Sequence, residues 1–135
     1  MLSLRFQIFT IMKKVIHTNN APAAIGPYSQ AIEANGMLFI SGQIPVNPAD
    51  GTVPEGITAQ TEQVMKNIAA ILDEAGYTFD NVVKTTCLLS DIANFGAMNE
   101  VYAKYFTSNP PARAAFAVRD LPKGVMVEIE VIAAK

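Results

Sequence analysis

Two charged side chains lie in an otherwise hydrophobic stretch near the C-terminus and are the first candidates for chemistry. Arg113 follows two prolines at the start of an apolar segment, and Glu128 lies in the alternating stretch 125–132. A guanidinium presents a planar fork of donors that matches a carboxylate. A carboxyl group in apolar surroundings has a raised pKa and can manage a water molecule or a proton. The pair therefore predicts a site for a small anionic substrate, and the alternative is an exposed cross-strand ion pair worth about 0–1 kcal/mol.

These two side chains need strands to position them. Segments 114–118 and 125–132 have the composition of strands, and the tight connection 120–124 carries Pro and Gly. We therefore expect neighbouring strands, with Glu128 and Glu130 on one face of the second and its valines and isoleucines on the other. The register of the two strands cannot be read from the sequence, so Arg113 and Glu128 could meet within one chain or across an interface.

Other residues are candidates for the walls of the site. Tyr28 follows Gly26-Pro27 in a loop and would either anchor that loop or line a pocket. Ser41 and Gly42 end a predicted strand, and a glycine there lets a ligand or a second backbone approach closely. Cys87 lies within a predicted strand and is expected to be a buried, inert thiol.

Composition excludes several classes of protein. The chain has 135 residues, of which 50% are hydrophobic and 16% charged, with a net charge of −2 and one cysteine. These values predict a single globular domain without an intramolecular disulfide, in a reducing compartment such as the cytoplasm. A nucleic-acid partner is not expected because no run of Lys or Arg occurs. No membrane span is expected, since no apolar run approaches about 20 residues. One His and one Cys predict no metal site.

The first twelve residues form a separate segment. They are apolar, with one Arg and no acid, and Leu2, Leu4, Phe6 and Ile8 alternate with polar residues. Three interpretations stay open: a weak targeting segment, which would allow a mitochondrial location, an extra strand, or an extension upstream of a natural start at Met12. The domain itself is expected to span residues 13–135.

The remaining pattern predicts two helices among strands. An apolar stripe with a 3.6-residue period predicts a helix over 57–75 that ends at Gly76, and a second helix is expected over 94–106, capped by Asp91 or Asn94. Strands are expected at 13–17, 31–34, 37–41 and 82–89, with Asn35-Gly36 forming a type I′ turn. The order β-β-β-α-β-α-β-β favours an α+β fold with both helices on one sheet face. The other face then has no cover within the chain, which predicts an oligomer.

The motifs also resemble a known family. P-A-R-A-A-F-A-V-R-D-L-P (111–122) followed by V-E-I-E (127–130) resembles the signature of the RidA (YjgF-type) enamine/imine deaminases. The likeness extends to A-I-G-P-Y-S-Q-A (24–31), F-I-S-G-Q-I-P-V (39–46), Q-T-E-Q-V-M-K-N-I (60–68) and N-E-V-Y-A-K-Y-F (99–106). Five separated motifs thus occur in order over nearly all of the chain from residue 13 onward.

The resemblance implies a chorismate-mutase-like fold, a homotrimer with a central β-barrel, and three clefts between subunits. It implies hydrolysis of 2-imino acids such as 2-iminopropanoate and 2-iminobutanoate, and of their 2-aminoacrylate-type enamine precursors, to 2-keto acids and ammonia without a cofactor. By motif, Arg113 would bind the substrate carboxylate and Glu128 would orient or activate the attacking water. Tyr28, Ser41 and Gly42 would line the pocket, and Asn99 would lie near the cleft.

One departure and two rival functions accompany the resemblance. Many relatives carry a cysteine two residues after the arginine, where this chain has Ala115, so thiol chemistry at that position should be absent. The first rival is a non-catalytic regulatory trimer that binds a small carboxylate in the same cleft. The second is a ribonuclease or translation inhibitor, a function attached to relatives that the acidic composition weakens.

Overall fold

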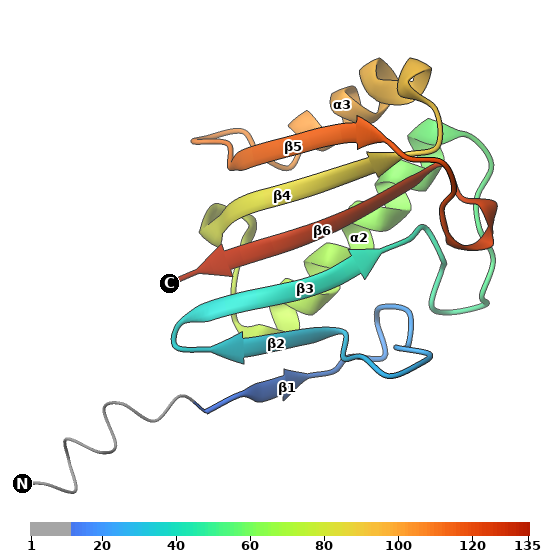
Figure 1. The fold of residues 1–135 in the computed structure, drawn as a ribbon. Helices are drawn as coiled ribbons and strands as arrows, with labels where there is room; N and C mark the ends of the chain where they lie inside the picture. Colours follow the sequence, from blue (N-terminus) through green and yellow to red (C-terminus); the bar gives the residue numbers. More distant parts are fainter. Residues whose placement is uncertain (1–11) are drawn as a thin grey trace, which may run out of the picture.

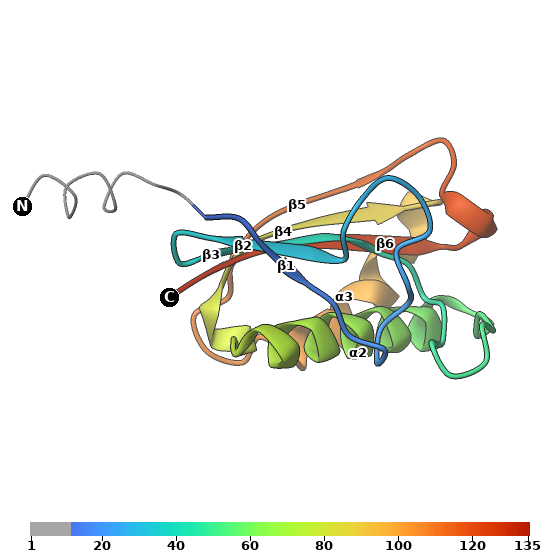
Figure 2. The same ribbon diagram turned by 90° about the horizontal axis from the view of Figure 1, so that it is seen from below.

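The computed structural model describes residues 12–135 as one mixed sheet with two helices on one face (Figures 1 and 2). Residues 1–11, and with them nearly all of the predicted extension, lie outside the described part of the chain. The strand order in the sheet is β1-β2-β3-β6-β4-β5. The strands are β1 (Lys14–Ile16), β2 (Ala31–Ala34), β3 (Met37–Gln43), β4 (Val82–Leu89), β5 (Ala112–Ala117) and β6 (Val127–Ala134), and the helices are α2 (Ile57–Ala75) and α3 (Phe95–Ala103). The predicted α+β class and element order are confirmed.

The hairpin of β2 and β3 follows from local turn chemistry. Asn35 and Gly36 both have positive φ angles, of 52° and 77°, as a type I′ turn requires. The two strands pair antiparallel, with Ala34 opposite Met37. β3 then continues two residues beyond the predicted end at Ser41, with a register shift against β6 between Ile40 and Gln43.

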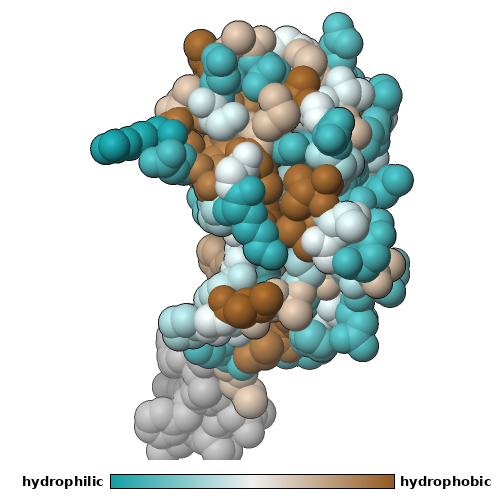
Figure 3. All heavy atoms as spheres, turned by 90° about the vertical axis from the view of Figure 1, so that its right-hand side faces the viewer, coloured by the Kyte–Doolittle hydropathy of each residue, from teal (hydrophilic) through white to brown (hydrophobic). Residues whose placement is uncertain are grey.

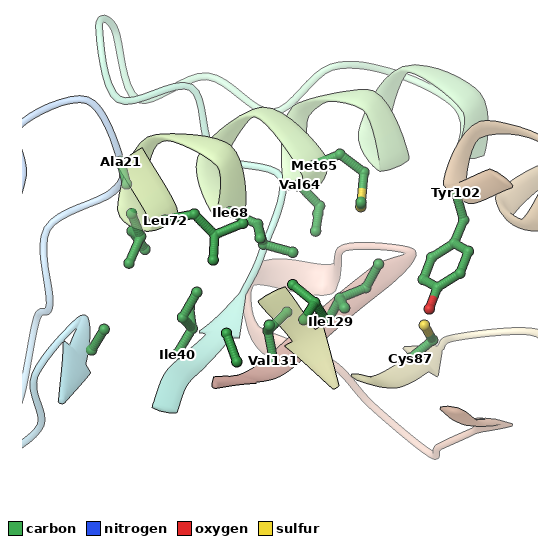
Figure 4. Close-up of a cluster of buried hydrophobic side chains, with 14 of the residues drawn as sticks. Ala21, Ile40, Val64, Met65, Ile68, Leu72, Cys87, Tyr102, Ile129 and Val131 are labelled. Atoms are coloured by element: carbon green, nitrogen blue, oxygen red, sulfur yellow. The ribbon is translucent and has the colours of Figure 1, made fainter. Parts of the chain in front are cut away.

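Helix α2 has the predicted bounds and supplies most of the core. It ends at Gly76, whose φ of 80° places it in the left-handed region that glycine favours at a helix C-terminus. Its apolar stripe packs on the inward side chains of β3 and β6 (Figure 4). The side chains at the centre of this interface are less than 5% exposed: Ile40, Val64, Met65, Ile68, Leu72, Ile129 and Val131.

The second helical segment is shorter than predicted. A 3-10 turn at Ile92–Asn94 precedes α3, and the carboxylate of Asp91 accepts a hydrogen bond from the backbone N–H of Ala93. Asp91 is therefore the cap, and Asn94 makes no side-chain capping bond. The helix ends at Ala103, but Phe106 still reaches the core from the turn that follows.

The prediction that the last two strands are neighbours is wrong. β4 lies between β5 and β6, parallel to β5 and antiparallel to β6. The parallel pairing becomes available because α3 carries the chain across the face of the sheet between β4 and β5, as in a βαβ unit. Segment 120–124 is accordingly part of a connection that passes the C-terminal end of β4, with a 3-10 turn at Pro122–Gly124, and no tight hairpin forms.

The second face of the sheet carries exposed apolar side chains. Those of Val15, Phe39, Val83 and Phe116 are each between 45% and 58% exposed. Val15 and Phe39 alternate along their strands with core residues such as Ile16, Leu38 and Ile40, and they lie in register with Ile32, which faces the same side. No helix in residues 12–135 is both long and apolar enough to cross a membrane.

Candidate functional site

Arg113 lies near the start of the edge strand β5 and is held by side chains of α3. One guanidinium nitrogen donates a 2.7 Å hydrogen bond to Oδ1 of Asn99. The guanidinium carbon lies 4.8 Å from the ring centroid of Tyr102 and 5.3 Å from that of Phe95, within the range of cation–π interactions. The side chain is solvent-exposed despite these contacts. A guanidinium fixed in this way keeps further N–H donors for a second, anionic partner.

A cavity of about 390 Å³ opens beside this guanidinium. Its walls come from α3, from the turn after it and from the two prolines before β5: Asn99, Tyr102, Ala103, Phe106, Pro110, Pro111 and Arg113. The walls are mostly apolar, and the one cationic group in them is Arg113. We call this group of residues the arginine half. It can bind a small carboxylate and hold an apolar substituent next to it.

Glu128 lies on β6 at the other face of the sheet, in a second cavity of about 450 Å³. The cavity is lined by Tyr28, Ser41, Gly42, Ile44, Pro122, Glu128 and Glu130. Burial raises the pKa of the Glu128 carboxyl above its ordinary value, and the nearby charge of Glu130 raises it further. A carboxyl with a raised pKa is suited to exchanging a proton with water or with a substrate nitrogen. We call this group the glutamate half.

Gly42 has a steric reason to be glycine. A Cβ atom built on it would overlap the carboxylate of Glu128, which packs directly against the backbone of β3. The φ angle of Gly42 is not positive, so backbone strain plays no part. The close approach that the sequence predicted at this glycine is therefore made by the Glu128 side chain.

The loop that carries Tyr28 is fixed by the polar side chains of Gln30 and Ser41. The amide of Gln30 is 2% exposed and bonds the backbone of Thr18 and Pro22, at distances between 2.8 and 3.0 Å. The hydroxyl of Ser41 donates a 2.6 Å hydrogen bond to the backbone oxygen of Ser29. Ser41 therefore anchors the loop, and Tyr28 is left half-exposed against the cavity.

A cavity of about 480 Å³ adjoins the glutamate half and shares Tyr28, Gly42, Ile44 and Pro122 with it. Its remaining walls come mainly from the loops that follow β1 and β3. Figure 3 shows hydrophobic surface at the centre of the end of the molecule where these loops lie. Sequence reasoning did not single out Ile44 and Pro122 as site residues, because both lie in irregular segments, although each falls within one of the family motifs.

The two halves lie on opposite faces of the same sheet. Arg113 pairs with Thr85, whose side chain is buried under the helices. Glu128 pairs with Leu88, which is an odd number of residues from Thr85 along β4 and therefore points to the other face. Asn99 joins Arg113, whereas Tyr28, Ser41 and Gly42 join Glu128. Within the chain, the predicted pair of catalytic residues is thus divided by the sheet.

The remaining candidates have structural roles. Cys87 is fully buried, and burial raises the pKa of its thiol to about 11, so the thiolate is scarce at neutral pH. His17 contacts Asn19 at the surface. Within residues 12–135, no group of three or more His, Cys, Asp or Glu side chains is arranged so that it could bind a metal ion.

The fold and the two halves define an α+β domain with an exposed arginine held at a sheet edge and a half-buried glutamate of raised pKa on the open face. The family model described as Endoribonuclease L-PSP matches residues 18–135, and the chain belongs to this family, which is the RidA (YjgF-type) family that the motifs predicted.

Similar proteins carry several different names. The mouse 2-iminobutanoate/2-iminopropanoate deaminase is 51% identical over 92% of this chain and 93% of its own length. A putative regulator AldR of Lactococcus lactis is 56% identical over 89% of this chain and 96% of its own length. The crystal structure of Escherichia coli TdcF with bound serine superposes with a TM-score of 0.88 at 39% identity, covering 90% of this chain and 98% of that one.

Proposed function

We propose that the protein hydrolyses small 2-imino acids, and the enamines that give rise to them, to 2-keto acids and ammonia. About half of its residues are identical to those of the mouse protein named for this activity. The observation that carries the proposal is the pair of half-sites: an arginine held for a carboxylate and a half-buried glutamate with a raised pKa. 2-Iminopropanoate and 2-iminobutanoate combine a carboxylate with an electrophilic C=N bond, so they need both groups.

The chemistry follows from the two halves. Arg113 binds the carboxylate in a bidentate pair and fixes the imine carbon next to the glutamate half. Glu128 takes a proton from water as the oxygen adds to the C=N carbon, and a proton passes to the nitrogen. Collapse of the carbinolamine forms the C=O bond and breaks the C–N bond, which releases ammonia. Water is the only co-reactant, and no cofactor is required by this sequence of steps.

We further propose that the complete cleft lies between two copies of the chain in a homotrimer. The sheet separates Arg113 from Glu128 in one subunit, so a small substrate can contact both only if a second copy brings its arginine half to the glutamate half. Four exposed apolar side chains on the open face, Val15, Phe39, Val83 and Phe116, supply surface for that contact. A central β-barrel made from three such sheets would cover this face, as obligate interfaces do.

The test of the activity is an assay of ammonia and keto acid from freshly generated 2-iminopropanoate. The wild-type protein should accelerate release well above the uncatalysed rate, and Arg113→Ala should lose that acceleration with the fold intact. Glu62→Ala is a suitable control, because Glu62 bonds Lys104 and Tyr105 and none of these three residues lines either half-site. A wild-type rate in Arg113→Ala would refute the carboxylate-binding role.

A regulatory function is the second candidate, and it is favoured by the similarity to the putative regulator of Lactococcus lactis. Glu128→Gln separates the two functions. If the protein is an enzyme, this variant should bind a keto-acid product with wild-type affinity but lose turnover. A binding module should show no turnover in either form. The ribonuclease implied by the family's description has weaker support, since the net charge is −2 and seven lysines and three arginines are scattered along the sequence.

The domain over residues 13–135 and a cytoplasmic location remain predictions. The location of fluorescent fusions with and without residues 1–12 would test whether that segment directs the protein to mitochondria.

A further inference from the structure

A buried pair of hydroxyl groups lies directly beneath the guanidinium of Arg113. Oη of Tyr102 is 2.7 Å from Oγ1 of Thr85, and the two residues are 5% and 1% exposed. Figure 4 shows the Tyr102 side chain descending from α3 with its oxygen directed toward β4, next to Cys87. The aromatic ring of Tyr102 contacts the guanidinium of Arg113, whose central carbon lies over the ring at 4.8 Å from its centroid.

Burying two hydroxyl groups in an apolar core needs a reason. A Phe–Val pair would fill nearly the same volume without polar atoms, and a buried hydroxyl that loses its partner costs about 1–3 kcal/mol. The hydrogen bond between the two hydroxyl groups therefore adds little to the free energy of folding. Its main effect is to fix the orientation of the Tyr102 ring. Burial also raises the pKa of Tyr102, so its hydroxyl stays protonated and the bond to Thr85 persists at physiological pH.

The arginine needs such a support. Arg113 lies on an edge strand and its side chain is exposed, and a free arginine side chain has about 2 kcal/mol of rotamer entropy to lose on binding. Asn99 holds one nitrogen of the fork, which still allows the guanidinium to rotate about that bond. The ring face of Tyr102, with Phe95 at 5.3 Å, restricts the plane of the fork. The hydrogen bond to Asn99 and the ring contacts together restrict the guanidinium of Arg113 to one orientation.

We propose that Tyr102, fixed by its hydrogen bond to Thr85, is a positioning residue that sets the plane of the Arg113 guanidinium for bidentate binding of the substrate carboxylate. The inference rests on the proposed function in one respect, that the partner of Arg113 is a substrate carboxylate. Tyr102 also lines the cavity of the arginine half, and the effect proposed here is the one that it exerts through Arg113. It should therefore change the affinity for the substrate more than the chemical step.

The kinetic test compares two graded variants with a matched control. Tyr102→Phe keeps the ring and removes the bond to Thr85, and should raise KM about 2- to 5-fold. Tyr102→Leu removes the ring face and should raise KM about 10-fold or more, with kcat within about 2-fold in both variants. Tyr105→Phe is the control: it loses a comparable hydroxyl bond, 2.8 Å to Glu62, on a residue that does not contact Arg113. The inference would be overturned if Tyr105→Phe raised KM as much as Tyr102→Leu does.

A double-mutant cycle separates positioning from simple structural support. Arg113→Lys keeps the charge but has no planar fork for the ring to orient. If Tyr102 acts through that fork, Tyr102→Leu should raise KM little further in the Arg113→Lys background. Additive effects of the two substitutions would contradict the proposal. Should Tyr102→Leu fail to fold, the same cycle with Thr85→Val or Tyr102→Phe, which keep the shape of the core, gives the answer.

Side-chain NMR gives a readout that does not depend on activity. The chain has three arginines, so the Nε–Hε signals of Arg113 and of the 97%-exposed Arg119 can be assigned by substitution. In the wild-type protein the Arg113 signal should show restricted motion, and Tyr102→Leu should make it as mobile as that of Arg119. Equal mobility of the two signals in the wild type would refute positioning. Restricted motion in a protein without deaminase activity would refute the proposed function and support the positioning role.

Discussion

At the scale of single residues, the carboxyl of Glu128, which we propose acts in the chemistry, also lowers the stability of the fold. Its carboxyl is half-buried on the open face of the sheet, close to Glu130, and both circumstances disfavour the ionised form. A carboxyl whose pKa is higher in the folded than in the unfolded protein makes the folded state bind its proton more tightly. The ionised glutamate therefore lowers stability at pH values above its folded-state pKa. This kind of local cost is typical of functional sites.

Glu128→Gln should therefore raise the free energy of unfolding at neutral pH. The gain should shrink as the pH falls toward the ordinary glutamate value of 4.5, because the wild-type carboxyl is then protonated as well. Urea unfolding at neutral pH and at about pH 4, at one fixed protomer concentration, measures both values. The exposed Glu100→Gln serves as the control and should change stability little at either pH. If the stability gain of Glu128→Gln instead grew as the pH fell, the pKa of Glu128 would be lowered in the folded protein, contrary to this prediction.

Gly42→Ala tests the steric contact between β3 and Glu128. The new methyl group overlaps the carboxylate, which is the far end of a flexible side chain and can rotate away. We expect kcat to fall at least about 10-fold. A displaced carboxylate needs to raise the activation free energy by only about 1.4 kcal/mol to have this effect. The free energy of unfolding should change by less than about 1 kcal/mol. Gly96→Ala, where a Cβ meets no atom within 4 Å, is the matched control. Unchanged turnover in Gly42→Ala would exclude a steric role for this glycine.

At the scale of elements, α2 positions the loop beside the glutamate half as well as the core. Asn67 is 1% exposed, and its amide nitrogen donates to the backbone oxygens of Ile44 and Val46. Gln60 binds the backbone N–H of Met126 just before β6, and the backbone oxygen of Pro54. Polar residues on the helix thereby fix two of the irregular segments that border the cavity.

Asn67→Ala should destabilise the protein by about 1–3 kcal/mol, because it leaves the buried carbonyl of Val46 without its donor. It also removes one of the two donors to the carbonyl of Ile44, which still accepts from the backbone N–H of Val46. The loop around Ile44 should also become more mobile, which should raise KM. Thermal unfolding and hydrogen exchange at residues 44–46 measure the two effects. Lys66→Ala, at the exposed neighbouring position of the same helix, should leave both unchanged. Wild-type exchange in Asn67→Ala would mean that the loop is held by other contacts.

At the scale of the whole molecule, the division of the site by the sheet makes a prediction about mixtures. Arg113→Ala and Glu128→Gln should each be inactive alone. In trimers formed from both variants in equal amounts, a cleft works when its arginine comes from one variant and its glutamate from the other. Random assembly gives this combination in about one quarter of the clefts.

Co-expression of the two variants with different affinity tags isolates the mixed trimers. Every mixed trimer then contains one working cleft of its three, so the activity should approach about a third of the wild-type rate per cleft. Sedimentation should give three times the 14.5 kDa mass of the chain. Mixing Arg113→Ala with the double variant Arg113→Ala/Glu128→Gln is the control and should stay inactive. No recovery in mixed trimers would show that each site is built within a single subunit.

Much of this protein follows from local sequence patterns. The 3.6-residue stripe of α2, the left-handed Gly76 and the Asn35-Gly36 turn are decided by neighbouring residues, and all three are as predicted. The sides taken by Glu128 and Val127 are also set by the two-residue period of a strand. The motifs were sufficient to predict the family.

Only the tertiary structure decided which strands lie beside one another. A sequence shows that 112–117 and 127–134 are strands, but pairing depends on where α3 returns the chain, and here β4 takes the place between them. That insertion puts Arg113 over Tyr102 on the helix side and Glu128 against Gly42 on the open side. Contacts between residues far apart in the chain have no local signature, because side-chain packing across the whole sheet selects them.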